Sequence, residues 1–172
     1  MKKSRWILLA EDDAPLAELT TLALQPEKLA CEVVVVGDGA EALDCIRRRG
    51  GYETRAEGYP VLVLLDLKMP KVDGLEVLRQ IKSDARLKCI PVVVFTSSRE
   101  PADVNRSYQL GVNAYVVKPT GFQEFSETLD GVGRFWAKLN ELAQDSSTDE
   151  RKTPVNPSEA TAVMDQPVVK AA

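Results

Sequence analysis

Histidine is absent from the 172 residues of this sequence, and cysteine is scarce. The lack of histidine excludes Ser-His catalytic pairs, histidine general bases, histidine-ligated metals and a phosphohistidine formed on this chain. The three cysteines, Cys31, Cys45 and Cys89, are odd in number and widely spaced. That pattern fits reduced thiols in a cytosolic protein better than a disulfide framework or a zinc site.

The sequence also lacks a basic excess and a long hydrophobic run. Lysine and arginine number 22 against 26 acidic residues, a net charge of −4. Without an overall basic field, direct binding to nucleic acid is not expected. The opening stretch MKKSRWILLAEDD has five apolar residues before three acids, too few for a signal peptide or a membrane span. We therefore expect a cytoplasmic protein with no membrane partner.

Five short apolar runs that do not alternate with polar residues predict strands. Continuous apolar runs of this length are typical of strands buried on both faces, as in a parallel sheet covered by helices. The runs are Trp6–Ala10, Val33–Val36, Val61–Leu65, Ile90–Phe95 and Ala114–Val117.

Helical segments are predicted between these runs. A capping residue followed three positions later by Glu or Gln predicts a helix start at three places, and apolar repeats predict two more helices. The three pairs are Asp38 with Glu41, Asp73 with Glu76, and Thr120 with Gln123, and the repeats lie at Leu16–Ala23 and Val104–Leu110. The chain therefore predicts five β-α units in a three-layer α/β domain.

The composition changes after about residue 144. The stretch that follows carries Pro154, Pro157 and Pro167, many polar residues and no aromatic residue. Such a composition favours a flexible, disordered tail over 145–172 rather than an output domain. The folded domain is expected to span 4–144.

Polar side chains follow four of the predicted strands. In an open parallel sheet, ligands bind at the carboxyl ends of the strands. Asp66 is notable there because Asp73 already supplies the cap of the next helix, which leaves Asp66 without a structural task. The strand-end residues are Glu11 and Asp12, Asp66, Thr96, and Lys118.

Three carboxylates at one edge would repel one another, and a hard cation such as Mg²⁺ would relieve the repulsion. Lys118 would add an ammonium at the same edge, and Thr96 a neutral donor. Such a site suits phosphoryl transfer, in which a carboxylate nucleophile forms an acyl phosphate.

The motifs ILLAEDD, LLDLKMPKVDG, VVVFTSS and AYVVKP resemble the receiver domains of two-component response regulators. The resemblance implies a flavodoxin-like (βα)5 fold with strand order 2-1-3-4-5. It implies Asp66 as the acceptor of a phosphoryl group from a sensor histidine kinase, with no enzymatic activity beyond the chain's own phosphorylation and dephosphorylation. It further implies that Asp12 binds Mg²⁺ directly, that Glu11 acts largely through water, and that the Lys68 carbonyl is a further ligand.

The same resemblance implies that Thr96 and Lys118 hold the phosphoryl group and that Tyr115 is the aromatic residue that turns inward when Thr96 moves. It also implies a cis Lys118–Pro119 bond. The segments SYQLGVNAYVVKP and GFQEFSETLDGVGRFWAKL are similar to those of stand-alone receivers that serve phytochrome-type histidine kinases.

Two alternatives fit parts of the sequence. A haloacid-dehalogenase-like phosphatase also forms an aspartyl phosphate, but it needs a second acid where this chain has Lys68. A dinucleotide-binding domain would use Gly37, Gly39 and Ala42 after a strand. The acids that end the first strand would repel a pyrophosphate, which disfavours that interpretation.

The last predicted helix begins at the Thr120 cap and carries an apolar stripe that is expected largely to face the sheet. The stripe consists of Phe122, Phe125, Leu129, Val132, Trp136 and Leu139. Phe135 and Leu142 lie beside it, seven positions apart. We expect them to form an exposed apolar edge used for self-association, giving a homodimer, or for kinase docking.

Overall fold

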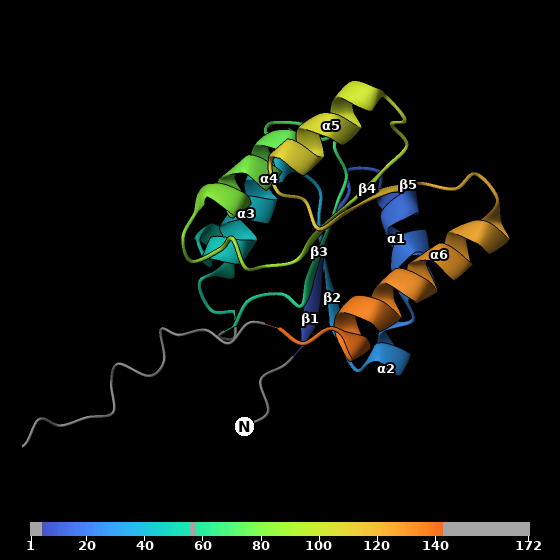
Figure 1. The fold of residues 1–172 in the computed structure, drawn as a ribbon. Helices are drawn as coiled ribbons and strands as arrows, with labels where there is room; N and C mark the ends of the chain where they lie inside the picture. Colours follow the sequence, from blue (N-terminus) through green and yellow to red (C-terminus); the bar gives the residue numbers. More distant parts are fainter. Residues whose placement is uncertain (1–4, 56–57, 143–172) are drawn as a thin grey trace, which may run out of the picture. The chain divides into compact units, whose positions relative to one another are not determined.

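A five-stranded parallel sheet of order β2-β1-β3-β4-β5 organises the protein, as a computed structural model shows (Figure 1). The structure describes residues 5–55 and 58–142. The strand order is the one that the sequence analysis predicted, and the strands agree with the predicted runs to within about two residues at each end. The strands are β1 (Trp6–Ala10), β2 (Glu32–Val36), β3 (Leu62–Leu65), β4 (Val92–Thr96) and β5 (Ala114–Val117).

Helices cover both faces of the sheet, which gives the predicted three layers. Figure 1 shows α3, α4 and α5 on one side and α1 and α6 on the other. The helices are α1 (Ala14–Leu24), the short α2 (Pro26–Leu29), α3 (Gly39–Arg47), α4 (Gly74–Ser83), α5 (Pro101–Gln109) and α6 (Phe122–Arg134). A 3₁₀ turn, Gly50–Tyr52, follows α3, and a π-helical segment, Phe135–Leu139, follows α6.

Two of the three predicted helix caps are confirmed. Asp38 and Asp73 each accept a hydrogen bond from the backbone three residues later, at the starts of α3 and α4. The third cap, at Thr120, is wrong, because α6 begins at Phe122 with Gly121 as its N-cap and no side-chain cap. The backbone at Gly121 is still extended, so the helix starts too late for the Thr120 hydroxyl to reach its free amides.

Burial on both faces holds for the three central strands. Every residue of β1, β3 and β4 is buried. The edge strands β2 and β5 are partly accessible, since each has a neighbouring strand on one side alone. The apolar side chains divide into two clusters, one between the sheet and α3 and α4, the other between the sheet and α1 and α6.

The stripe on the last helix faces the sheet in part. Phe125 and Leu129 are buried, whereas Phe122 and Leu139 are each 70% exposed. Phe122 stands at the first position of α6, and the helix widens to π geometry from Phe135. The widening breaks the 3.6-residue periodicity on which the predicted stripe depends, so Leu139 turns away from the core.

The predicted boundary at residue 144 and the tail 145–172 lie outside the described residues. Within the part of the chain that the structure describes, no helix combines the length and the apolar character that crossing a membrane requires.

Candidate functional site

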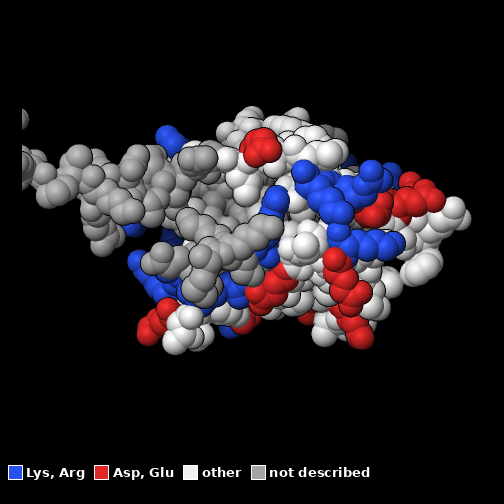
Figure 2. Space-filling model, turned by 90° about the horizontal axis from the view of Figure 1, so that it is seen from below, with Lys and Arg blue, Asp and Glu red and all other residues white. Residues whose placement is uncertain are grey.

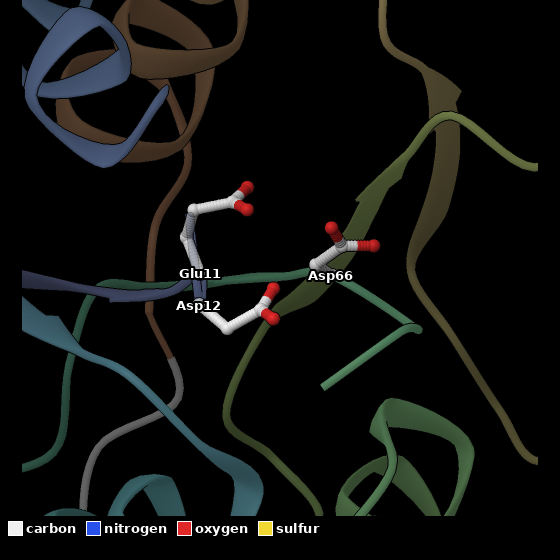
Figure 3. Close-up of side chains that lie close together, drawn as sticks. All are labelled: Glu11, Asp12 and Asp66. Carbon is white, nitrogen blue, oxygen red and sulfur yellow. The ribbon is translucent and has the colours of Figure 1, made fainter. Parts of the chain in front are cut away.

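Three carboxylates meet at the carboxyl edge of the sheet. Glu11 and Asp12 follow β1 directly, and Asp66 follows β3 directly. One carboxylate oxygen from each lies within 4.8 Å of the others, a spacing at which they could hold a metal ion. Figure 3 shows the Glu11 and Asp12 side chains extending from the end of β1 toward the side on which Asp66 lies. Glu11 and Asp66 are buried, and Asp12 is exposed.

Backbone pairing between the strands fixes this convergence. Ala10 of β1 stands opposite Leu65 of β3, so the residues that follow them emerge at the same level. The Asp66 amide donates to the Ala10 carbonyl at 3.0 Å, and the Glu11 amide donates to the Val36 carbonyl at 3.0 Å. The sheet register itself therefore places the two buried acids side by side.

Lys118 bridges the two buried acids. Its ammonium Nζ donates to Glu11 Oε2 and to Asp66 Oδ2, each at 2.6 Å, and its side chain is 8% exposed. The Lys118 amide donates to the Thr96 carbonyl at 2.8 Å, which fixes the backbone from which the side chain extends. The predicted ammonium at this edge is thus an ion-pair partner of both acids.

The electrostatics of the cluster suit a divalent cation. Burial raises the pKa of Glu11, although the bond to Lys118 opposes that shift. With all three acids ionised, one ammonium leaves two negative charges uncompensated, and two of the three acids, Glu11 and Asp66, are buried. Mg²⁺ prefers carboxylate and carbonyl oxygens, and the donors gathered here are of that kind. The residues therefore fit the predicted Mg²⁺.

The segment after β3 wraps closely around Asp66. The Lys68 amide donates to Asp66 Oδ1 at 3.3 Å, and the Gly74 amide donates to the Leu67 carbonyl at 2.9 Å. A Cβ at Gly74 would overlap the Asp66 carbonyl, so the glycine is required by this close approach. The Lys68 side chain is exposed. The sequence analysis missed the role of Gly74, although its place after the Asp73 cap was a usable signal.

Thr96 and Tyr115 are joined through Ser98. Thr96 is fully buried at the end of β4, and its Oγ1 accepts a hydrogen bond from the Ser98 amide at 3.4 Å. The Tyr115 hydroxyl donates to the Ser98 carbonyl at 3.1 Å. The Ser98 hydroxyl donates to Asp103 Oδ2 at 2.5 Å, in the first turn of α5. Sequence reasoning missed Ser98 and Asp103, because their contact depends on how β4 leads into α5.

The predicted cis bond at Lys118–Pro119 is wrong. Among residues 5–55 and 58–142 the structure contains no cis peptide bond. The trans form of a bond before proline is favoured by about 0.5–1 kcal/mol, so the isomer is set by its surroundings and not by the dipeptide itself.

Phe135 is about half exposed in the π-helical segment, and Leu142 is exposed beyond its end. The two residues are therefore not on one continuous helix as predicted, but both present apolar surface.

The model of the response regulator receiver domain family matches residues 7–130. The chain belongs to this family. Both the family and the parallel sheet that the sequence analysis predicted are thus confirmed, and the acidic cluster is compatible with Mg²⁺ binding and aspartate phosphorylation.

Named relatives lie within the same family. The response regulator Rcp1 of Synechocystis sp. is 38% identical over 130 residues, which cover 76% of this chain and 87% of Rcp1. The crystal structure of the phosphorylated cyanobacterial phytochrome response regulator RcpA is matched with a TM-score of 0.76 and 39% identity, covering 82% of this chain and 99% of that one. The bacteriophytochrome response regulator AtBRR is 55% identical with a TM-score of 0.65, covering 80% of this chain and 99% of that one.

Proposed function

We propose that Asp66 accepts a phosphoryl group from a sensor histidine kinase. The observation that carries this proposal is the position of Asp66, buried in the acidic cluster and 2.6 Å from the Lys118 ammonium. A carboxylate held beside a fixed cation, with two further acids for a metal, has the components of phosphoryl transfer. Glu11 and Asp12 are the acids that serve the metal in this proposal.

In the transfer, an Asp66 carboxylate oxygen forms a bond to phosphorus while the phosphorus–nitrogen bond of the kinase phosphohistidine breaks. The imidazole leaves with the electron pair of that bond. Lys118 moves from its ion pairs to the transferred phosphoryl oxygens, and the Thr96 hydroxyl donates to one of them. Mg²⁺, held by Glu11, Asp12, Asp66 and the Lys68 carbonyl, supplies neutralisation of negative charge when bound. Apart from this self-phosphorylation and the later hydrolysis of the aspartyl phosphate by water, which releases inorganic phosphate, the chain is not an enzyme in this proposal.

The phosphodonor is a phytochrome-type histidine kinase. The support comes from RcpA and AtBRR, which are described as phytochrome and bacteriophytochrome response regulators and which match this chain over 80% or more of its length. The phosphorylated domain then acts in the cytoplasm by binding other proteins. Lys and Arg side chains lie next to Asp and Glu on the face shown in Figure 2, which supports a protein partner over nucleic acid.

Self-association through the end of α6 is part of the proposal. Phe135 and Leu142 present apolar side chains to solvent there, and the exposed Leu139 lies between them in the sequence. Apolar groups gathered at one end of a helix are stabilised by a partner surface. A homodimer would supply such a surface.

Intact mass measurement after incubation with acetyl phosphate tests the acceptor. Wild type is expected to gain one phosphoryl group in the presence of Mg²⁺ and none in the presence of a chelator. The Asp66→Asn variant should gain none. Asp44→Asn, which changes an exposed acid of α3, serves as the matched control and should be phosphorylated normally. Undiminished phosphorylation of Asp66→Asn would disprove the assignment.

Transfer from radiolabelled kinases tests the donor. A phytochrome-type kinase should phosphorylate wild type faster than a kinase of a different sensor class, at equal concentrations of both proteins. Equal rates from the two kinases would contradict the phytochrome assignment while leaving Asp66 as the acceptor.

A further inference from the structure

A second charged contact lies close to the acidic cluster, between the turn that precedes α3 and the loop of residues 67–73 that follows Asp66. The Lys71 ammonium donates to Asp38 Oδ2 at 2.5 Å, across 33 positions of sequence. The Asp38 side chain is 11% exposed, whereas that of Lys71 is 69% exposed. An accessible lysine of the loop therefore pairs with a nearly buried carboxylate that belongs to a different segment.

The two carboxylate oxygens of Asp38 have different partners. Oδ1 accepts from the Glu41 amide at 2.8 Å and so caps α3, while Oδ2 accepts from Lys71. A cap requires one acceptor oxygen, which a neutral asparagine supplies equally well. The bond to Lys71 is the first cause of the lowered pKa of Asp38. The charge of Asp38 thus serves the contact with the loop, not the cap.

The turn before α3 is a firm support for the loop. Glu41 accepts from the Gly37 amide at 2.9 Å and from the Tyr52 hydroxyl at 2.6 Å. Gly39 packs so closely against the loop that a Cβ there would overlap the Val72 carbonyl. This contact also accounts for the glycine that suggested dinucleotide binding. Because the loop packs directly against the turn, the position of the turn constrains the position of the loop.

The backbone of Lys71 lies in the left-handed region. Its φ is +62°, which residues with a Cβ rarely adopt. From this conformation the Lys71 side chain extends to Asp38, and its ammonium donates to the Asp38 carboxylate.

The loop determines the surroundings of Asp66. It begins directly after that residue, and the Lys68 amide donates to Asp66 Oδ1. It closes where the Gly74 amide donates to the Leu67 carbonyl, with Gly74 against the Asp66 carbonyl. A shift of the loop would therefore move both the Lys68 backbone and the hydrogen bond to the Asp66 carboxylate.

We propose that Asp38 and Lys71 are positioning residues, which hold the loop 67–73 so that the Asp66 carboxylate and the Lys68 carbonyl converge on the metal. This inference rests on the proposed function. Neither residue touches the metal in this arrangement, and both act through the loop.

The test is Mn²⁺ affinity, measured from the electron paramagnetic resonance signal of the free ion during titration of the full chain. Lys71→Gly removes the ammonium and relieves the backbone, and Asp38→Asn keeps the cap and removes the charge. Each is expected to weaken Mn²⁺ binding about tenfold, at the lower end of what loss of an outer-shell contact causes at metal sites. Lys71→Arg can still pair with Asp38 and should bind nearly as wild type does.

The sign of the effect separates positioning from simple electrostatics. Removing a positive charge close to an acidic cluster should by itself tighten cation binding, so weakening in Lys71→Gly cannot come from the charge. Arg79→Met and Glu76→Gln break an exposed ion pair on α4 and serve as matched controls for the two charge changes. Both controls should bind Mn²⁺ within about twofold of wild type. The double variant Asp38→Asn with Lys71→Gly should bind no more weakly than either single variant, because the two residues act as a pair.

The outcomes distinguish the inference from the proposed function. Binding by wild type together with equal or tighter binding by Lys71→Gly would overturn the positioning role alone. Absence of Mn²⁺ binding in wild type would overturn the proposed function and this inference with it. If Asp38→Asn unfolds at a lower urea concentration than wild type, the Mn²⁺ affinity of Lys71→Gly still tests the positioning role. Glycine adopts the left-handed conformation of position 71 without strain, so this variant is expected to stay folded during the titration.

Discussion

The Lys118 ammonium lies 2.6 Å from Asp66 Oδ2 and makes an equally short bond to Glu11, so the proposed phosphoacceptor is already paired with the group proposed to bind its phosphoryl oxygens. All three side chains are less than a tenth exposed. Removing one member of a buried ion pair leaves the other charge unpaired, which typically costs about 3–5 kcal/mol. We therefore expect Lys118 to stabilise the folded state in addition to its proposed role in holding the phosphoryl group.

Lys118→Ala is expected to lower the free energy of unfolding by about 3 kcal/mol without metal. Saturating Mg²⁺ should recover part of the loss, because it replaces the missing positive charge. Urea unfolding, followed by tryptophan fluorescence with chelator or with Mg²⁺, checks both effects. Lys118→Ala should also lose the spectral change that beryllofluoride, a phosphoryl mimic, causes in wild type. If beryllofluoride caused the full wild-type spectral change in Lys118→Ala, the Lys118 ammonium would not be needed for the response to the phosphoryl group.

A second prediction concerns the path from Thr96 to α5. Ser98 links the Thr96 hydroxyl and the Tyr115 hydroxyl to Asp103 in the first turn of that helix. Ser98→Ala removes the hydroxyl's bond to Asp103 and the bond that the hydroxyl accepts from the Glu100 amide at 3.3 Å, and it keeps the backbone contacts of Ser98 with Thr96 and Tyr115. We expect phosphorylation to remain within about twofold of wild type, since the hydrogen bonds of the Ser98 hydroxyl go to Asp103 and Glu100 and not to Asp66 or Lys118.

The response of α5 to phosphorylation should weaken in Ser98→Ala, which amide hydrogen exchange over Pro101–Gln109 measures with and without beryllofluoride. Ser97→Ala, which changes an exposed neighbour, should respond as wild type does. If beryllofluoride changes the exchange of α5 identically in all three proteins, the hydrogen bonds of the Ser98 hydroxyl do not transmit the effect of phosphorylation to α5.

The thiols give a third prediction. Burial raises the pKa of Cys45 to about 11, and burial also raises the pKa of Cys31, while Cys89 is exposed. At about pH 8 the two buried thiols should stay protonated and inaccessible, so iodoacetamide should alkylate one cysteine in the native protein and three after denaturation. In the native Cys89→Ser variant, iodoacetamide should alkylate no cysteine. Alkylation of a second cysteine in native wild type would contradict the burial of Cys31 and Cys45.

Much of the site follows from the sequence because of one physical rule. The carboxyl ends of parallel strands meet at one edge, so acids that follow two buried runs had to converge once the strand order was set. Glu11, Asp12 and Asp66 were placed in this way. The bridge from Lys118 to both acids was not predicted, since it depends on the path of a side chain that starts at the far strand β5.

Other features depend on contacts between distant segments, which residue patterns do not encode. Asp13 directly follows Glu11 and Asp12, and its position in the sequence allows either a capping or a catalytic role. Its carboxylate accepts a hydrogen bond from the Leu16 amide, which shows that it caps α1. The sequence gives no sign that Lys71 pairs with Asp38, because the capping pattern already accounts for Asp38. The change to π geometry at Phe135 likewise has no signal in the residue pattern, and it is why the predicted stripe fails at Leu139.

The last prediction concerns self-association through the end of α6. Phe135 is 49% exposed, and its ring stands edge-on to the partly buried Trp136, with 5.0 Å between the ring centroids. Aromatic side chains have few rotatable bonds and bury a large apolar area, so an exposed one suits the centre of an interface. We expect wild type to dimerise more strongly with beryllofluoride and Mg²⁺ than without them. In Phe135→Ala the dimer should weaken by about tenfold, or roughly 1.4 kcal/mol.

Sedimentation of the two proteins, each with and without beryllofluoride, decides the matter. Tyr108→Ala is the matched control, because Tyr108 is an aromatic residue with a similar exposure of 53% but lies on α5, on the opposite face of the sheet from α6 (Figure 1). That variant should dimerise as wild type does. If wild type and Phe135→Ala sediment as monomers in every condition and bind the kinase equally well, the exposed apolar surface of Phe135 has no role as an interface. If the dimer persists unchanged in Phe135→Ala, the protein associates through another surface.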